Sequence, residues 1–318
     1  MKTFHSSEFA TLRSIQRPVH LAVGMFDGIH IGHQAVIHSA IQAAELDGGL
    51  CGLLTFDPHP SYLFRPEDPT PQIYPAILKE VLLREMGLDL CLIQSFTEKF
   101  SSHTAEEFVA HLTGILPTLS SISVGENFRF GKGRSGSPSL LVKTLSQKGI
   151  SVFSCERVQL DGDPISSTRI RAILPRRPIQ EVNRLLGKPY HSIGTVQRGK
   201  QLGRPIGFPT LNIPIDTEIL PPFGVYLVRF RKNVEASRQP QFGVANFGLR
   251  PTVESSESPL LEIHSLEERP PDYGDIVVTE WLRFLRPEKK FSNVEELKRT
   301  IQSDKESALK LIEQFRTE

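Results

Sequence analysis

Cysteine is scarce in this chain, whose 318 residues include only Cys51, Cys91 and Cys155, with no CxxC pair. This spacing argues against a disulfide framework and a paired-thiolate zinc site, and it favours a reducing compartment. Long apolar runs are missing as well, because no segment approaches the ~18 apolar residues of a membrane span. The first residues, MKTFHSSEFATLRS, lack the apolar core of a signal peptide. We therefore expect a soluble, cytoplasmic protein with no membrane partner.

An excess of charge of either sign is also absent. The chain has 37 basic and 36 acidic residues, a formal net charge of +1. That balance predicts no broad positive field for a nucleic-acid backbone, so we expect no nucleic-acid partner, although a local basic patch is compatible with it. Apolar residues make up 39% of the chain and charged residues 23%, as in ordinary globular proteins. A length of 318 residues favours two domains.

In the first half of the chain, strand-like and helix-like segments alternate. This alternation predicts a parallel sheet with covering helices. Ligands of such sheets bind beyond the carboxyl ends of the strands, where Phe26-Asp27, Phe56-Asp57 and residues 125–127 fall. The expected strands are 20–26, 50–56, 88–96 and 121–128, and the expected helices are 32–46, 75–87 and 104–116.

The pattern changes after Tyr190. Short alternating runs separated by glycine and proline are typical of a small antiparallel barrel or sandwich. A helix is expected over 292–315, with a capping box formed by Ser292 and Glu295. We place the boundary at a change of texture near 186–191, which gives domains of residues 1–187 and 188–318.

The segment VGMFDGIHIGHQAVI (23–37) places two histidines at a predicted strand-to-helix junction. Unpaired amides and the positive helix dipole make a helix start suitable for phosphate. Gly24 and Gly28 allow the backbone to bend and a ligand to approach it closely. His30 and His33 can donate hydrogen bonds to oxygens that gain charge during displacement at phosphorus. The alternative is a plain turn whose histidines bond nearby backbone groups.

Three other segments of the first half have side chains suited to a nucleotide. In ISSTRIR (165–171), hydroxyls and two arginines can bind phosphate oxygens, or simply cap a helix and face solvent. In VGENFRFGKGRSG (124–136), Phe128 and Phe130 can stack on a flat ring or pack in the core. His59 of TFDPHP (55–60) suits either a ligand contact or a structural turn.

In the second half, GTVQRGKQLGRPIGFPTLNI (194–213) is rich in glycine, proline and basic residues. It lacks the spacing of a P-loop, and by pattern alone it also suits a β-turn. Thr210 and Asn212 offer the hydroxyl and amide oxygens that suit Mg²⁺. In LLEIHSLEE (260–268), alternation puts Glu262 on the strand face opposite its two apolar neighbours, which leaves both a solvent-facing and a functional role open.

The first-half motifs resemble the HxGH nucleotidylyltransferases, and more closely the N-terminal half of bacterial bifunctional riboflavin kinase/FAD synthetases. The resemblance implies an α/β nucleotidylyltransferase domain with a Rossmann-like parallel sheet. It also implies that His30 and His33 are catalytic and that flavin is bound by His59, Asn127 and Phe128. The residues that it implies for ATP and phosphate are Gly24, Phe26, Asp27, Gly28, Ser166, Ser167, Thr168 and Arg171.

The segment G-x-x-x-G-R-x-x-G-F-P-T-x-N resembles the hallmark of the riboflavin kinase barrel, so a small antiparallel β-barrel with a C-terminal helix is expected. The resemblance implies that Glu262 is catalytic and that Thr210 and Asn212 bind the metal. Two segments depart from the family pattern, PDYG (271–274) and PRRP (175–178). The residues implied for ATP in the kinase are Gly203, Arg204, Gly207, Pro209, Thr210 and Asn212.

The combined hypothesis is a bifunctional enzyme that acts on riboflavin, FMN and ATP with Mg²⁺. Its C-terminal domain would phosphorylate riboflavin to FMN, and its N-terminal domain would adenylylate FMN to FAD and pyrophosphate. One alternative is that only one half is active. Another is a tRNA-acting relative, because class I aminoacyl-tRNA synthetases also carry a HIGH-type element, found here at residues 30–33. The sequence predicts no oligomeric state.

Overall fold

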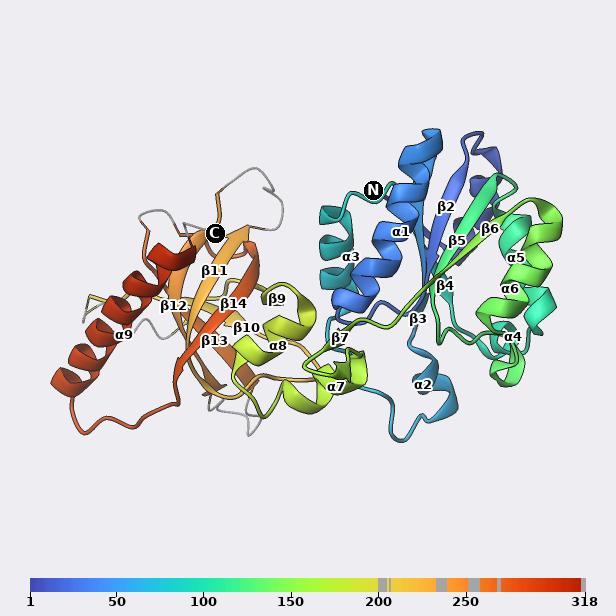
Figure 1. Ribbon diagram of the computed structural model, residues 1–318. Coiled ribbons are helices and arrows are strands. Elements are labelled where there is room, and N and C mark those ends of the chain that lie inside the picture. Colours follow the sequence, from blue (N-terminus) through green and yellow to red (C-terminus); the bar gives the residue numbers. More distant parts are fainter. Residues whose placement is uncertain (200–204, 206, 233–238, 251–257, 268–269, 316–318) are drawn as a thin grey trace. The chain divides into compact units, whose positions relative to one another are not determined.

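A parallel sheet and an antiparallel sheet divide the chain between them (Figure 1). The computed structural model describes residues 1–199, 205, 207–232, 239–250, 258–267 and 270–315. The chain forms two compact units, of residues 1–71 with 79–167 and of residues 72–78 with 168–318. The expected functional boundary after residue 187 stays a prediction.

The first unit contains a six-stranded sheet in the order β1-β4-β3-β2-β5-β6, with every pair parallel. Its strands are β1 (Lys2–His5), β2 (Val19–Val23), β3 (Leu50–Asp57), β4 (Leu90–Ser95), β5 (Leu119–Gly125) and β6 (Ser151–Cys155). The α-helices of this half are α1 (Ile31–Asp47), α2 (Pro60–Phe64), α3 (Ala76–Glu85), α4 (Glu98–Ser101), α5 (Ala105–Ile115) and α6 (Pro138–Leu145). Shorter elements are the 3-10 helices η1 (Ser6–Ser14), η2 (Lys132–Arg134) and η3 (Ser146–Lys148), and a hairpin of β7 (Gln159–Leu160) and β8 (Asp163–Pro164).

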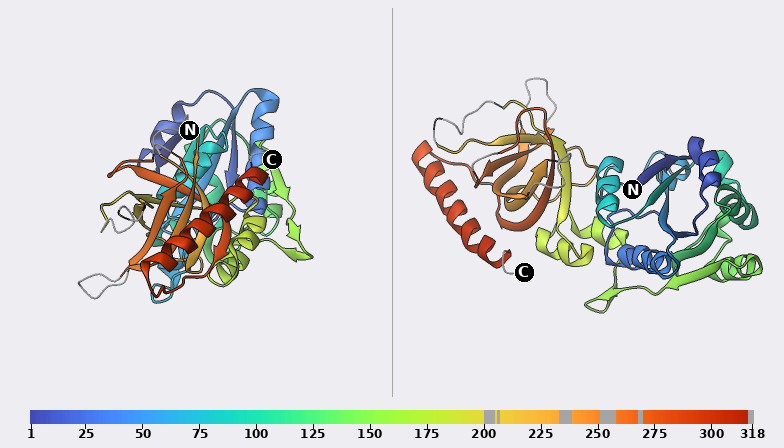
Figure 2. Two further views of the ribbon diagram at one scale, coloured as in Figure 1. Left: turned by 90° about the vertical axis from the view of Figure 1, so that its left-hand side faces the viewer. Right: turned by 90° about the horizontal axis from the view of Figure 1, so that it is seen from above.

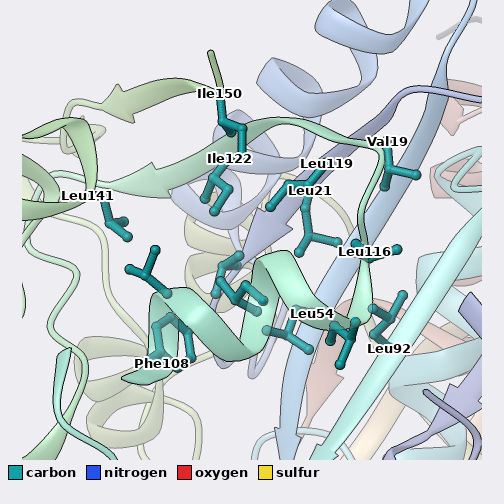
Figure 3. Close-up of a cluster of buried hydrophobic side chains, with 14 of the residues drawn as sticks. Val19, Leu21, Leu54, Leu92, Phe108, Leu116, Leu119, Ile122, Leu141 and Ile150 are labelled. Carbon is teal, nitrogen blue, oxygen red and sulfur yellow. The ribbon is translucent and has the colours of Figure 1, made fainter. Parts of the chain in front are cut away.

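Helices cover both faces of the parallel sheet, so its central strands are buried throughout. Every residue of β2 is buried, which explains its unbroken apolar character. Leu21 and Ile122 face α5 and pack with Phe108 of that helix in a large apolar cluster (Figure 3). The opposite face of the sheet is covered by α1 (Figure 1). This double cover fixes the direction in which the loops at the strand ends emerge.

The strand order places a topological switch at β2. From β2 the chain adds β3 and β4 on one side, and it then crosses to add β5 on the other. Ligands of open α/β sheets bind at such a switch point, beyond the carboxyl ends of the strands, where the loops that follow β2 and β5 lie. The strands end earlier than expected, β2 at Val23 and β5 at Gly125, because the backbone turns at these points into loops.

The second unit contains an antiparallel sheet in the order β10-β13-β12-β11-β14-β9. Its two edges meet at one bridge between Gln197 and Asn212, so the sheet curls into a partly closed barrel. Its strands are β9 (Tyr190–Thr195), β10 (Leu211–Pro214), β11 (Gly224–Lys232), β12 (Gln241–Arg250), β13 (Ser258–Ser265) and β14 (Ile276–Arg286). Its helices are α7 (Ser167–Ile173), which begins at the last residue of the first unit, α8 (Ile179–Leu186) and α9 (Val294–Phe315).

Aromatic side chains fill the interior of the barrel, and α9 covers part of its outside (Figure 2). The fully buried Trp281 meets Tyr226 and Phe247 edge to face, and its indole N–H donates to Ser192 Oγ at 2.8 Å. Ala308 and Ile312 of α9 belong to a separate cluster with apolar residues of β11 and β12.

The start of α9 differs from the sequence prediction by one residue. Glu296, not Glu295, accepts the Ser292 N–H at 3.0 Å, and the Glu296 N–H donates to Asn293 Oδ1 at 2.8 Å. The predicted box of Ser292 and Glu295 is wrong, because asparagine also caps helices well and takes the cap position. Lys289 and Ser292 donate to Glu296 and lower the pKa of its carboxyl to about 2.

Candidate active sites

The loop between β2 and α1 has an unusual backbone. Phe26, Gly28 and Ile29 all have positive φ angles, of 51°, 83° and 43°. This region is rare for residues with a side chain and costs roughly 1–3 kcal/mol at each. Phe26 and Ile29 are fully buried, so apolar burial offsets that cost. A strained loop held by packing is a common feature of ligand sites, and it suits the predicted phosphate loop.

His30 is the N-cap of α1, and its role in the fold constrains its chemistry. Its Nδ1 accepts the His33 N–H at 3.2 Å, and the two imidazoles stack with centroids 3.6 Å apart. A neutral ring whose Nδ1 accepts carries its proton on Nε2. Part of the plain-turn interpretation therefore holds for His30, whose ring proton lies on Nε2.

Two glycines leave room that side chains would fill. A Cβ at Gly32 would lie 3.2 Å from Cε1 of His30, and a Cβ at Gly24 would lie 3.2 Å from the Phe26 ring. Gly32 did not appear among the predicted site residues. The closeness of Gly32 to the His30 ring is visible only in the structure.

Ser167 joins the segment 165–171 to the same loop. Its hydroxyl donates to the Asp27 carbonyl oxygen at 2.9 Å, across 140 residues of sequence. Ser166 is half-buried beside it in the chain. Thr168 and Arg171 follow on α7 and belong to the second unit, so their place at this site stays a prediction.

The three predicted flavin contacts lie on the loops after β3 and β5. His59 caps α2, with Nδ1 accepting the Ser61 N–H at 3.1 Å. Asn127 is exposed and donates to its neighbour Glu126, while Phe128 is half-buried and stacks on Phe130 with centroids 5.5 Å apart. The structure thus gives His59 and Phe128 local structural contacts, and flavin contact stays a prediction for all three.

In the second unit, three polar residues form a row across neighbouring strands. Glu262 of β13 lies opposite Asn212 of β10 on one side and opposite Asn246 of β12 on the other. Directly opposed residues project from the same face of a sheet within about 4.5–5.5 Å at Cβ. Leu261 and Ile263 are fully buried, so the row lies on the face opposite the barrel core, as alternation predicts. Asn246 is a further candidate that the sequence prediction omitted.

The loop before β10 is held against this row. His264 Nδ1 bonds the Pro209 carbonyl oxygen at 3.0 Å, and the Gln197 N–H donates to the Asn212 carbonyl oxygen at 2.8 Å. Gly207 is left-handed, with φ of 88°, and Thr210 is exposed. Gly203 and Arg204 lie outside the described residues.

The donor atoms near Asn212 limit the kind of metal site that is compatible with the chain. Among the described residues, no group of three or more His, Cys, Asp or Glu side chains is arranged to hold a metal ion. The exposed Thr210 hydroxyl and the amide of Asn212, 7% exposed, supply neutral oxygens. Such a set fits Mg²⁺ that is bound mainly by water and ligand phosphates, and it does not fit an ion caged by protein alone.

An HxGH helix start at the edge of a parallel sheet, together with a polar row on an antiparallel half-barrel, defines a nucleotide-dependent transferase with two sites. The family models described as FAD synthetase and riboflavin kinase match residues 12–169 and 186–312. The chain belongs to the family of bifunctional riboflavin kinase/FMN adenylyltransferases. It is therefore both a kinase and a nucleotidyltransferase, with riboflavin, FMN and ATP as substrates, and the predicted fold class and domain order are confirmed.

Relatives from bacteria match nearly the whole chain. The bifunctional riboflavin kinase/FMN adenylyltransferase of Listeria monocytogenes is 34% identical over 90% of this chain and 90% of its own. The protein of that name from Bacillus subtilis is 32% identical over 99% of this chain and 100% of its own. A solved structure from Streptococcus pneumoniae, described as a macrolide-efflux protein, has a TM-score of 0.83 at 29% identity and covers 97% of this chain and 99% of its own. Neither family model supports the alternative of a tRNA-acting relative.

No helix within the described residues is long and apolar enough to cross a membrane.

Proposed function

We propose that FMN adenylylation takes place on the loop between β2 and α1. The observation that carries this proposal is the N-cap geometry of His30, which puts its ring proton on Nε2 at the positive N-terminal end of a long helix. Phosphate oxygens of ATP bind there, and His30 and His33 donate to the charge that develops as pyrophosphate leaves. Main-chain groups of the same loop also bind ATP; these belong to Gly24, Phe26, Asp27 and Gly28.

Around this centre, the remaining predicted residues have supporting roles. Ser166, Ser167, Thr168 and Arg171 bind phosphates of the nucleotide, for which hydroxyls and a guanidinium are suited. His59, Asn127 and Phe128 bind the flavin at the ends of β3 and β5. The bond from Ser167 to the loop supports the first group.

Riboflavin phosphorylation takes place on the polar row of the second unit. Glu262 accepts the proton of the riboflavin 5′-hydroxyl as that oxygen attacks the γ-phosphate of ATP. Thr210 and Asn212 would hold Mg²⁺, which would neutralise charge on the phosphates. The residues that would contribute to ATP binding are Gly203, Arg204, Gly207 and Pro209. Asn246 orients Glu262 from the neighbouring strand. The register that aligns Glu262 with Asn212 supports this arrangement.

The three cysteines are free thiols, as is usual in the reducing cytoplasm. They are therefore compatible with an enzyme that converts riboflavin to FMN and FAD in the cytoplasm.

Separation of flavins after incubation with Mg-ATP tests both assignments in one protein. We expect His33→Ala to lose FAD formation from FMN and to keep riboflavin phosphorylation, and Glu262→Gln to show the reverse. If His33→Ala lost the kinase and kept the adenylyltransferase, the assignment of the sites would be wrong. A wild-type protein that makes FMN without FAD would show that only one half is active.

A further inference from the structure

Lys79 is a buried lysine in the first unit that none of the roles above uses. It lies on α3 and is 7% exposed, although lysine is almost never buried unless it is paired. Its Nζ lies 3.4 Å from Thr55 Oγ1 on β3, and that hydroxyl donates to the Met25 carbonyl oxygen at 3.0 Å. The Lys79 side chain thus contacts Thr55 near the end of β3 and, through that hydroxyl, is linked to Met25 in the loop that follows β2.

Two carboxylates interact electrostatically with the Lys79 ammonium. Burial lowers the pKa of Lys79, and the negative charges of Asp27 and then Asp57 act in the opposite direction. Asp27 is itself 3% exposed and lies in the loop between β2 and α1. Asp57 is the last residue of β3 and is exposed. The Cys91 thiol on β4 also interacts electrostatically with Lys79, and burial raises its pKa to about 11, so it stays neutral at pH 7.

A buried carboxylate in a phosphate-binding loop poses an electrostatic problem. An ionised Asp27 would repel the triphosphate of ATP, and its field would be weakly screened because water is excluded. Of the nearby groups that the structure describes, Lys79 brings a positive charge to the buried side of this loop. His30 and His33 lie on the α1 side of the same loop.

We propose that Lys79 is a positioning residue of the FMN adenylyltransferase site, which neutralises Asp27 and joins the loop ends of β2 and β3 beneath the bound phosphates. The inference rests on the proposed placement of FMN adenylylation on that loop. It assigns to α3 a function in ATP affinity.

The test compares Lys79→Met with Arg84→Met, a control on the exposed side of the same helix, whose side chain is 59% exposed. In Lys79→Met we expect the KM for ATP in FMN adenylylation to rise about tenfold or more, as loss of a buried counter-charge implies. Riboflavin phosphorylation by the other unit should stay at the wild-type rate and reports folding. Arg84→Met should match the wild type in both reactions.

A double variant separates neutralisation from a purely structural role, because only neutralisation depends on the Asp27 carboxylate. The double variant Lys79→Met/Asp27→Asn should recover most of the lost ATP affinity.

Two results would overturn the proposal: a KM for ATP that Lys79→Met leaves unchanged, or a double variant no better than the single one. If Lys79→Met does not fold, Lys79→Gln takes its place, since it also removes the charge but keeps a polar group near Thr55, and an unchanged KM for ATP in Lys79→Gln would refute the idea. Failure of the proposed site itself is seen separately, as normal FMN adenylylation by His33→Ala.

Discussion

Gly199 offers a sharp test of the kinase site, because a single methyl group there would displace a proposed metal ligand. A Cβ at Gly199 would lie 2.5 Å from Cγ, Nδ2 and Oδ1 of Asn212, whereas ordinary contact begins at 3.4 Å. The Asn212 backbone is held by the Gln197 N–H, so the side chain must move. We expect Gly199→Ala to impair riboflavin phosphorylation and to leave FMN adenylylation intact.

The size of the effect follows from that displacement. The amide must withdraw by about 1 Å, and a misplacement of this order can cost roughly 10²-fold in rate. That factor corresponds to about 2.7 kcal/mol of transition-state stabilisation. Turning the Asn212 side chain away from its rotamer costs a further ~0.5–1.5 kcal/mol of folding stability, which is too little to unfold the domain.

The assay supplies riboflavin or FMN with Mg-ATP in separate reactions and resolves the flavins by chromatography. Gly199→Ala should resemble Asn212→Ala in the first reaction and the wild type in the second. Gly114→Ala is the matched glycine control, because a Cβ at that position in α5 meets nothing within 4 Å. Kinase activity of Gly199→Ala within about threefold of wild type, or an equal loss of both activities, would refute the reasoning.

Three further predictions concern stability. Ile122→Ala should destabilise the first unit by ~2–5 kcal/mol, because Ile122 is fully buried in the sheet. On heating, this variant should lose FMN adenylylation before riboflavin phosphorylation, and the opposite order would contradict the prediction. Ser192→Ala leaves the Trp281 N–H without its acceptor, and calorimetry should show a loss of ~1–3 kcal/mol, whereas an unchanged melting temperature would show that this bond contributes nothing. Burial lowers the pKa of Lys188 to about 8 from 10.5, so the unfolded state binds more protons between these values and stability rises with pH there. Lys188→Met should therefore raise the melting temperature at pH 7 and lose that advantage near pH 10.5, and a gain independent of pH would argue against this origin.

The positions in the fold of the first candidate site's histidines could be predicted, because the elements around them are local in sequence. His30 and His33 occur within one strand-to-helix junction, so helix periodicity alone places them at a helix start. The alternation around Glu262 likewise predicts its strand face, since side chains of a strand alternate strictly. Family resemblance then supplied the chemistry that these local patterns leave open.

Other features depend on strand register and helix packing. Asn246 becomes a candidate only when β12 pairs with β13, and Gly199 matters only because it lies against Asn212. The cap of α9 lies one residue from the predicted position. Several residues near its start can cap a helix, and only the backbone geometry determines which of them does so.

The sequence by itself determined that this chain has two units, which motifs lie at their strand ends, and to which enzyme family it belongs. These properties follow from local propensity and from motifs of a few consecutive residues. Only the tertiary structure decided that Lys79 of α3 lies beneath the loop between β2 and α1. The physical reason is that burial and Coulomb interactions depend on distance in space, and the sequence separation of Asp27 and Lys79 does not reveal that distance.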